Sequence, residues 1–150
     1  MELILWRHAE AEDGAPDMQR KLTDKGRLQA LRMGEWLKQR LPRDTRILVS
    51  PSLRTQQTAL ALSHSFETVD TLAPGANVRH VLEAAGWPNA NGTVVIVGHQ
   101  PTLGEVAAKL LANSNDSWSV KKGAIWWFAQ RGQGEFAETV LKTALAPNML

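Results

Sequence analysis

The amino-acid sequence predicts an α/β fold: a three-layer α/β/α sandwich with a mostly parallel sheet and an antiparallel edge. Three short apolar runs, at residues 3–6, 47–49 and 93–97, lack polar alternation, which is typical of parallel strands covered on both faces. Helical patterns separate these runs, as in an open α/β sheet. The 150 residues have the length of one domain, so we expect a single domain over residues 1–150.

The first half of the chain supplies two of these strands and two helices. After the strand at residues 3–6 comes a polar loop, and Thr23 then has the position of an N-cap. The helix that follows is expected to end near Arg40 and to pack one face on the sheet. That face carries apolar residues three or four positions apart: Ala30, Met33, Leu37 and Leu41. After the second strand, Ser50 as N-cap and Pro51 at the first helical position predict an immediate second helix.

The second half adds two helices and the antiparallel edge. We expect one helix over residues 78–85 and another that begins at Pro101. Two or three antiparallel strands joined by turns should follow, at residues 117–120, 124–129 and 135–141. Trp126 and Trp127 are adjacent in one of these strands and point to opposite faces, so at most one lies in the core; whether the other forms an exposed contact surface stays open.

Composition and charge exclude several classes of protein. With 43% hydrophobic and 21% charged residues, the chain is typical of a globular domain and not of a disordered segment. Its net charge is only +2 and its basic residues are scattered, so we expect no nucleic-acid partner. The absence of cysteine excludes disulfides and thiolate metal sites. The first apolar run is too short for a signal peptide or a membrane span, so we expect a cytoplasmic protein without a membrane partner.

Four cationic or imidazole side chains follow the ends of the predicted strands. Arg7 and His8 follow the first strand, Arg54 lies in the first helical turn after the second, and His99 follows the third. Because ligands of open α/β sheets bind at the carboxyl ends of the strands, these side chains can share one site. An arginine in a first helical turn opposes the helix dipole, which favours an anion beside Arg54. Two arginines and two histidines predict a site for a phosphoryl group.

Such a site supports covalent phosphoryl transfer. An imidazole nitrogen that attacks phosphorus forms a phosphohistidine, provided that it is unprotonated and that the other ring nitrogen orients it. We expect Arg7 and Arg54 to hold the phosphoryl oxygens and a protonated His99 to donate to them. His64, at a predicted helix end, and His80, inside a predicted helix, have positions typical of structural histidines.

Four ordered motifs resemble those of the histidine phosphatase superfamily, also called phosphoglycerate mutase-like. They are Leu5-Trp6-Arg7-His8, residues 22–30, the Ser-Pro-x-x-Arg-Thr-x-Gln-Thr-Ala motif at residues 50–59, and Gly-His-Gln-Pro at residues 98–101. The chain length and residues 20–23 are most similar to small bacterial SixA-type phosphohistidine phosphatases. The resemblance implies a phosphoglycerate mutase-like fold, His8 as the nucleophile, phosphate binding by Arg7, Arg54 and His99, and Arg20 as a fifth member of the site. It implies no metal and no cofactor.

Two departures from the family pattern bear on the chemistry. Ala9 replaces the usual glycine after Arg-His, which is harmless if the backbone φ there is negative. Larger members carry a carboxylic acid that protonates the leaving oxygen, whereas this chain has Ala73 where that acid is expected. Four loop carboxylates could reach the pocket, although such groups are more typically solvated: Glu10, Glu12, Asp13 and Asp70. Of these, Glu10 is our candidate substrate-binding residue.

These observations predict a metal-independent phosphatase that forms phospho-His8. A site without a general acid favours phosphohistidine, whose imidazole leaving group can already be protonated. We therefore expect a phosphorylated protein as partner, such as a phosphorelay or phosphocarrier domain. Two alternatives stay open: a phosphomonoesterase for a small phosphorylated metabolite, which needs a loop carboxylate as acid, and a binding module for phosphorylated ligands without turnover. A mutase is disfavoured because little chain remains to reorient an intermediate, and metal hydrolysis because no ligand motif is present.

Overall fold

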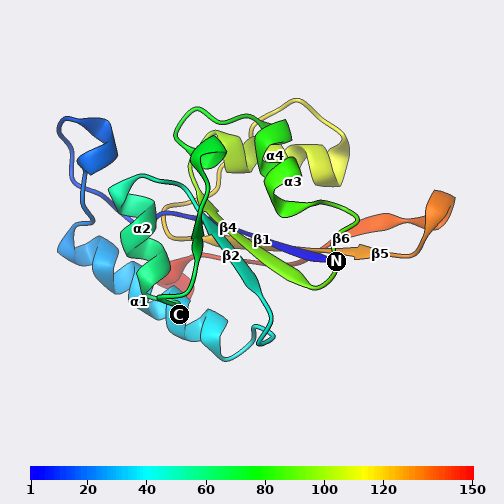
Figure 1. Cartoon of the computed structure of the whole chain (residues 1–150), viewed down its shortest axis with the longest axis horizontal. Helices are drawn as coiled ribbons and strands as arrows, with labels where there is room; N and C mark the ends of the chain where they lie inside the picture. Colours follow the sequence, from blue (N-terminus) through cyan, green and yellow to red (C-terminus); the bar gives the residue numbers. More distant parts are fainter.

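The computed structural model describes residues 1–150 and contains one six-stranded sheet (Figure 1). The strands are β1 (Glu2–Arg7), β2 (Arg46–Val49), β3 (Glu67–Thr68), β4 (Thr93–Gly98), β5 (Ile125–Arg131) and β6 (Glu138–Leu145). Their order across the sheet is β3-β2-β4-β1-β5-β6. The first four are parallel, β5 is antiparallel to β1, and β6 is antiparallel to β5. The predicted fold class, mostly parallel with an antiparallel edge, is confirmed.

Helices cover both faces of this sheet. They are α1 (Asp24–Lys38), α2 (Leu53–Leu60), α3 (Val78–Ala85) and α4 (Thr102–Ala112). Figure 1 shows α3 and α4 on one face and α1 and α2 on the other. Alternate residues of β1 enter two different cores: Leu3 and Leu5 pack with α3 and α4, whereas Ile4 and Trp6 pack with α1 and α2. Two covered faces explain why the strand is apolar throughout.

Helix α1 begins as predicted, whereas α2 begins later. The hydroxyl of Thr23 accepts a hydrogen bond from the backbone N–H of Gly26 at 2.9 Å, which confirms Thr23 as the N-cap. The expectation that Ser50 caps α2 is wrong, because Ser52 has that role and the helix starts at Leu53. The Ser50 hydroxyl instead lies 2.8 Å from Nε2 of His99.

The region after α4 differs from the prediction in two respects. The last strand is β6 at Glu138–Leu145 and not residues 135–141, because Gly134–Phe136 form a 3-10 turn. Residues 117–120 form no strand, because Trp118 exchanges hydrogen bonds with the backbone of Gly104 and the side chain of Gln100 at the start of α4.

Of the two adjacent tryptophans only Trp127 is buried, as predicted, but the half-buried Trp126 forms no exposed contact surface. Trp127 packs edge-to-face on Trp36 in one core, and Trp126 packs beside Trp118 in the other, because helices or loops cover both faces of β5.

The loop between β1 and α1 is attached to the first turn of α1. The carbonyl oxygen of Glu10 accepts a hydrogen bond from the backbone N–H of Thr23 at 3.0 Å, and Ala11 pairs with Leu22 in an isolated antiparallel bridge. Gly26 permits this approach, since a Cβ at Gly26 would lie 1.9 Å from that Glu10 oxygen. The loop that follows His8 is therefore held to the helix by its backbone. None of the helices is long and apolar enough to cross a membrane.

Gly26→Ala should destabilise the protein, although alanine is the better helix former by about 1 kcal/mol. The added methyl group overlaps a backbone oxygen that cannot move without breaking the loop attachment, so we expect a loss of at least about 1 kcal/mol in the free energy of unfolding. Urea unfolding measures this loss. Arg32→Ala, at an exposed position of α1, is the control and should change stability by less than about 0.5 kcal/mol. A stabilised Gly26→Ala variant would contradict the steric argument.

Candidate active site

The pairing of β1 with β4 brings the two candidate histidines together. These strands are parallel neighbours with Arg7 opposite Gly98, so the residues that follow, His8 and His99, leave the sheet side by side. The backbone N–H of His8 donates to the Gly98 carbonyl at 3.1 Å. The ring centroids lie 5.3 Å apart, and both side chains are buried. Arg54, in the first turn of α2, is buried as well and joins them.

His8 has the protonation state and orientation that a nucleophile requires. Its Nδ1 lies 2.7 Å from the carbonyl oxygen of Ala9, and because a carbonyl only accepts, Nδ1 carries the hydrogen and Nε2 a lone pair. Burial lowers the pKa of His8 to about 4 against the opposing effect of the Ala9 hydrogen bond, and the charges of Arg54, Arg7 and Arg20 lower it further. His8 is therefore neutral at pH 7.

Ala9 fits without strain in place of the glycine usual at this position. It is fully buried, and its φ is not among the positive values of the chain. Its methyl group packs with Leu22 and Ala30, and its N–H donates to the Thr58 hydroxyl on α2 at 3.1 Å. The methyl group thus contributes to packing while the carbonyl orients His8.

The expectation of a protonated His99 is wrong for this structure. Burial, followed by the effects of His8 and Arg54, lowers the pKa of His99 to about 3. A neutral His99 can still donate a hydrogen bond. If the Ser50 hydroxyl donates to Nε2 across their 2.8 Å separation, Nδ1 carries the hydrogen. Ser50 is therefore a site residue that sequence reasoning assigned only to a helix cap.

Three buried nitrogens of this site have no hydrogen-bond partner. They are Nε of Arg7, Nε of Arg54 and Nδ1 of His99, and no other buried side-chain nitrogen or oxygen in the protein is unpaired. Because buried polar groups are almost always hydrogen-bonded, three unpaired nitrogens in one cluster indicate a site for a ligand with several acceptor oxygens. Arg7 is held by a hydrogen bond from Nη1 to the Val120 carbonyl at 2.9 Å.

Asp17 is the carboxylate of this site, and the sequence analysis did not identify it. Arg54 donates from Nη1 to the Asp17 carbonyl at 2.8 Å and from Nη2 to its carboxylate at 3.1 Å. Arg20 donates from Nε to the same carboxylate at 3.0 Å, so Arg20 reaches the site through Asp17. Although burial by itself raises the pKa of Asp17, hydrogen bonds from Arg20 and Arg54 hold it below its usual value. Asp17 is thus ionised and unsuited to donate a proton.

The loop carboxylates considered as alternative acids have other environments. The Glu10 carboxylate accepts from the Thr23 hydroxyl at 2.7 Å and lines a pocket of about 420 Å³ with Arg7, Lys121 and Lys122. Its side chain makes no hydrogen bond to the two histidines or Arg54. Three further carboxylates are exposed and have no hydrogen bond to the site: Glu12, Asp13 and Asp70. No group of three or more histidine, aspartate or glutamate side chains is placed to hold a metal ion.

Comparison with known proteins identifies similar chains. The profile of the histidine phosphatase superfamily (branch 1) matches residues 3–74, which include Arg7, His8 and Arg54. A phosphohistidine phosphatase SixA homolog of Haemophilus influenzae is 35% identical over 131 residues, 77% of this chain and 80% of that protein. Phosphohistidine phosphatase SixA of Escherichia coli is 33% identical over 119 residues, 73% of this chain and 74% of that protein. A structure of the protein histidine phosphatase SixA complexed with tungstate is 25% identical and has a TM-score of 0.78, with 99% of both chains covered.

Acid should destabilise the protein through the two buried histidines. Their pKa values are about 4 and about 3 in the folded state and 6.5 as ordinary side chains, so the unfolded state binds more protons below pH 6.5. Stability should therefore be highest above pH 6.5 and fall as the pH drops toward 4. Urea unfolding at pH 7 and pH 5 should show a smaller loss for His99→Gln than for the wild type. His64→Gln, at an exposed position, should lose as much as the wild type; equal losses in all three proteins would contradict the argument.

A tetrahedral oxyanion should bind to the three unpaired nitrogens. We expect inorganic phosphate to bind the wild type, and Arg54→Lys to bind it at least about tenfold more weakly, because lysine lacks the Nε–H and the planar fork of arginine. Isothermal titration calorimetry measures both affinities. Arg43→Lys, at an exposed position outside the site, is the matched control and should bind like the wild type. Unchanged affinity in Arg54→Lys would show that the anion binds elsewhere.

Proposed function

Since the chain belongs to the histidine phosphatase superfamily and is a phosphatase, we propose that it hydrolyses phosphohistidine on a protein through a phosphorylated intermediate on His8. The observation that carries this proposal is the neutral His8, with a free Nε2, beside three unpaired nitrogens of Arg7, Arg54 and His99. A phosphoryl group needs a nucleophile together with donors for its oxygens, and this cluster supplies both.

In the first step, Nε2 of His8 attacks the phosphorus atom and the P–N bond of the substrate breaks. If the substrate ring carries a proton on its other nitrogen, it leaves as a neutral imidazole. The new phosphohistidine keeps its hydrogen on Nδ1 and donates a hydrogen bond from it to the Ala9 carbonyl, which stabilises the positive charge of the ring. No separate acid is needed, because each imidazole keeps the hydrogen on its other ring nitrogen while the phosphoryl group passes from the substrate ring to His8.

In the second step, a water molecule attacks the phosphorus atom and the P–Nε2 bond breaks. His8 leaves as a neutral imidazole that still carries its Nδ1 hydrogen, and dihydrogen phosphate is released with both hydrogens of the water. Arg7 and Arg54 stabilise the charge on the equatorial oxygens in both steps. Asp17 positions Arg54 by holding both terminal nitrogens of its guanidinium, which leaves Nε for the phosphoryl group.

The substrate class follows from the state of the carboxylates. Expelling an alkoxide from a phosphate monoester benefits from a general acid by about 10²–10⁴-fold. Hydrogen bonds from Arg20 and Arg54 lower the pKa of Asp17 and keep it ionised, and the Glu10 carboxylate accepts a hydrogen bond from the Thr23 hydroxyl. A site with these groups favours an imidazole leaving group over an alkoxide. The names of the relatives, phosphohistidine phosphatases, support the same substrate, and the tungstate complex of a similar protein supports a site for a tetrahedral oxyanion.

Phosphate release in EDTA tests this proposal. We expect the wild type to dephosphorylate a phosphohistidine protein at least about 100-fold faster than a sugar phosphate, because only the alkoxide leaving group of the sugar phosphate requires a general acid. His8→Ala should be inactive on both, whereas His64→Ala should keep the wild-type rate. Brief reaction with a radiolabelled phosphohistidine protein should place label on the wild type and none on His8→Ala.

Other outcomes identify the alternatives. Equal turnover of the sugar phosphate would show that a general acid exists and that the protein is a metabolite phosphatase. Asp17→Asn would then locate that acid if it slowed the sugar phosphate far more than phosphohistidine. Binding of the phosphoprotein without release or labelling would indicate a binding module.

A further inference from the structure

Helix α2 contributes to two neighbouring surfaces. Arg54 and Thr58, four residues apart, belong to the active site. Leu53, Gln57 and Leu60 lie on the adjacent face, at the spacing of one helical stripe. Leu53 and Leu60 are 37% and 43% exposed. The same helix therefore supplies the active site and an apolar external surface.

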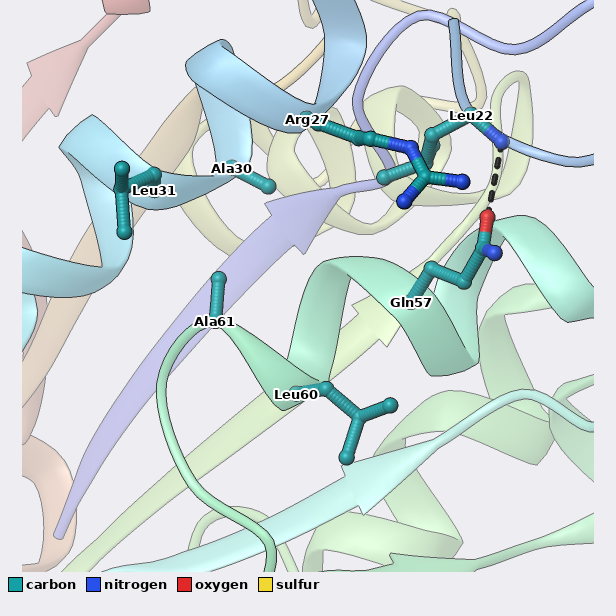
Figure 2. Close-up of a pocket in the computed structure, with 7 residues that line it drawn as sticks. All are labelled: Leu22, Arg27, Ala30, Leu31, Gln57, Leu60 and Ala61. Atoms are coloured by element: carbon teal, nitrogen blue, oxygen red, sulfur yellow. Dashed lines mark hydrogen bonds between the residues drawn. The ribbon is translucent and has the colours of Figure 1, made fainter. Parts of the chain in front are cut away.

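A groove lies where this face of α2 meets α1. It encloses a cavity of about 400 Å³, and Figure 2 shows Leu31 of α1 and Leu60 of α2 on its opposite walls. At the other end, the Gln57 side chain accepts a hydrogen bond from the Leu22 backbone N–H at 2.8 Å, and the Arg27 side chain extends toward them. Leu22 ends the loop that begins at His8, so the groove is continuous with the active-site loop.

Exposed apolar side chains line the groove. Leu31 and Leu60, which are 50% and 43% exposed, belong to its lining together with Leu22, Ala30 and Ala61. Leu53, on the same stripe of α2 as Leu60, is exposed as well and precedes Arg54 in the chain. Such a concentration of apolar surface is typical of a protein-binding site.

The charge that lines the groove indicates an acidic partner. Arg27 is the one charged residue of the lining, and no carboxylate belongs to it. Two more basic residues, Arg20 and Lys21, precede Leu22 in the chain. A partner with carboxylates beside its apolar side chains would complement Arg27 and be steered toward it.

We propose that the groove between α1 and α2 binds an acidic amphipathic helix of the phosphorylated protein, next to its phosphohistidine. A helix with apolar residues at positions i, i+3 or i+4, and i+7 can place them between Leu31 and Leu60 while an acidic residue meets Arg27. Because α2 forms both surfaces, a helix in the groove holds the phosphohistidine near His8. This inference rests on the proposed function and adds how the protein substrate is selected.

Substitutions in the groove test this inference. The substrates are a helical histidine phosphotransfer domain phosphorylated on its histidine and, as a small substrate, phosphoramidate. Leu31→Asp and Leu60→Asp should each lower kcat/KM for the phosphorylated domain by about tenfold or more, mainly through KM. Both variants should hydrolyse phosphoramidate like the wild type, because the groove does not contact a small substrate. Leu31→Met should retain the wild-type kcat/KM for the domain.

Phe136→Asp is the matched control, since Phe136 is 80% exposed in the connection between β5 and β6. It should leave kcat/KM for the phosphorylated domain and the rate of phosphoramidate hydrolysis at their wild-type values. If Leu31→Asp and Leu60→Asp both kept wild-type kcat/KM for the domain, the docking inference would be wrong while the proposed function stood. If they lowered the phosphoramidate rate equally, the groove would act on the site and not on the partner. A wild type unable to dephosphorylate the domain or free phosphohistidine would overturn the proposed function itself.

Discussion

The parallel pairing of β1 with β4 is the constraint on which the site depends. With Arg7 opposite Gly98, the next residue of each strand leaves the sheet at the same edge, and His8 and His99 come within 5.3 Å between ring centroids. The hydrogen bond from the His8 N–H to the Gly98 carbonyl continues the ladder beyond the strands. A shift of one residue in this register would turn the apolar side chains of β1 into the opposite cores, so packing on both faces holds the catalytic geometry.

Charge balance at this edge decides which chemistry the site supports. Burial and nearby arginines keep both histidines neutral, which leaves His8 with the lone pair that the proposed nucleophile requires, and Arg20 and Arg54 keep Asp17 ionised. One electrostatic arrangement therefore both favours attack on a phosphoryl group and withholds a carboxylic acid. Asp17 also fixes Arg54, whose guanidinium is buried and would be costly to leave unpaired. Selectivity for an imidazole leaving group then follows from the site itself, and selectivity for a protein can come from the surface that α2 shares with α1.

Much of this arrangement could be predicted from the sequence because it depends on local patterns. Uninterrupted apolar runs mark strands covered on both sides, Thr23 is the N-cap of α1, and α3 has its predicted bounds at residues 78–85. Arg7, His8, Arg54 and His99 could be grouped because each follows a strand end in an α/β order. In a parallel sheet the carboxyl ends of the strands lie at one edge, so motifs that are distant in the sequence can be assigned to one site.

Side-chain partners across the fold were beyond that reasoning. In the sequence Ser50 has the position of a helix cap, whereas in the fold its hydroxyl lies 2.8 Å from Nε2 of His99. Asp17 lies in a loop without periodicity, and its role is evident only from its ion pairs with Arg54 and Arg20. Trp126 is covered by a loop that the sequence pattern assigned to a strand. The protonation of His99 likewise depends on burial and neighbouring charges. The sequence by itself determined the strands, helices and chemical groups, since these depend on neighbours along the chain; only the tertiary structure decided their partners and charges, because hydrogen bonding and desolvation depend on neighbours in space.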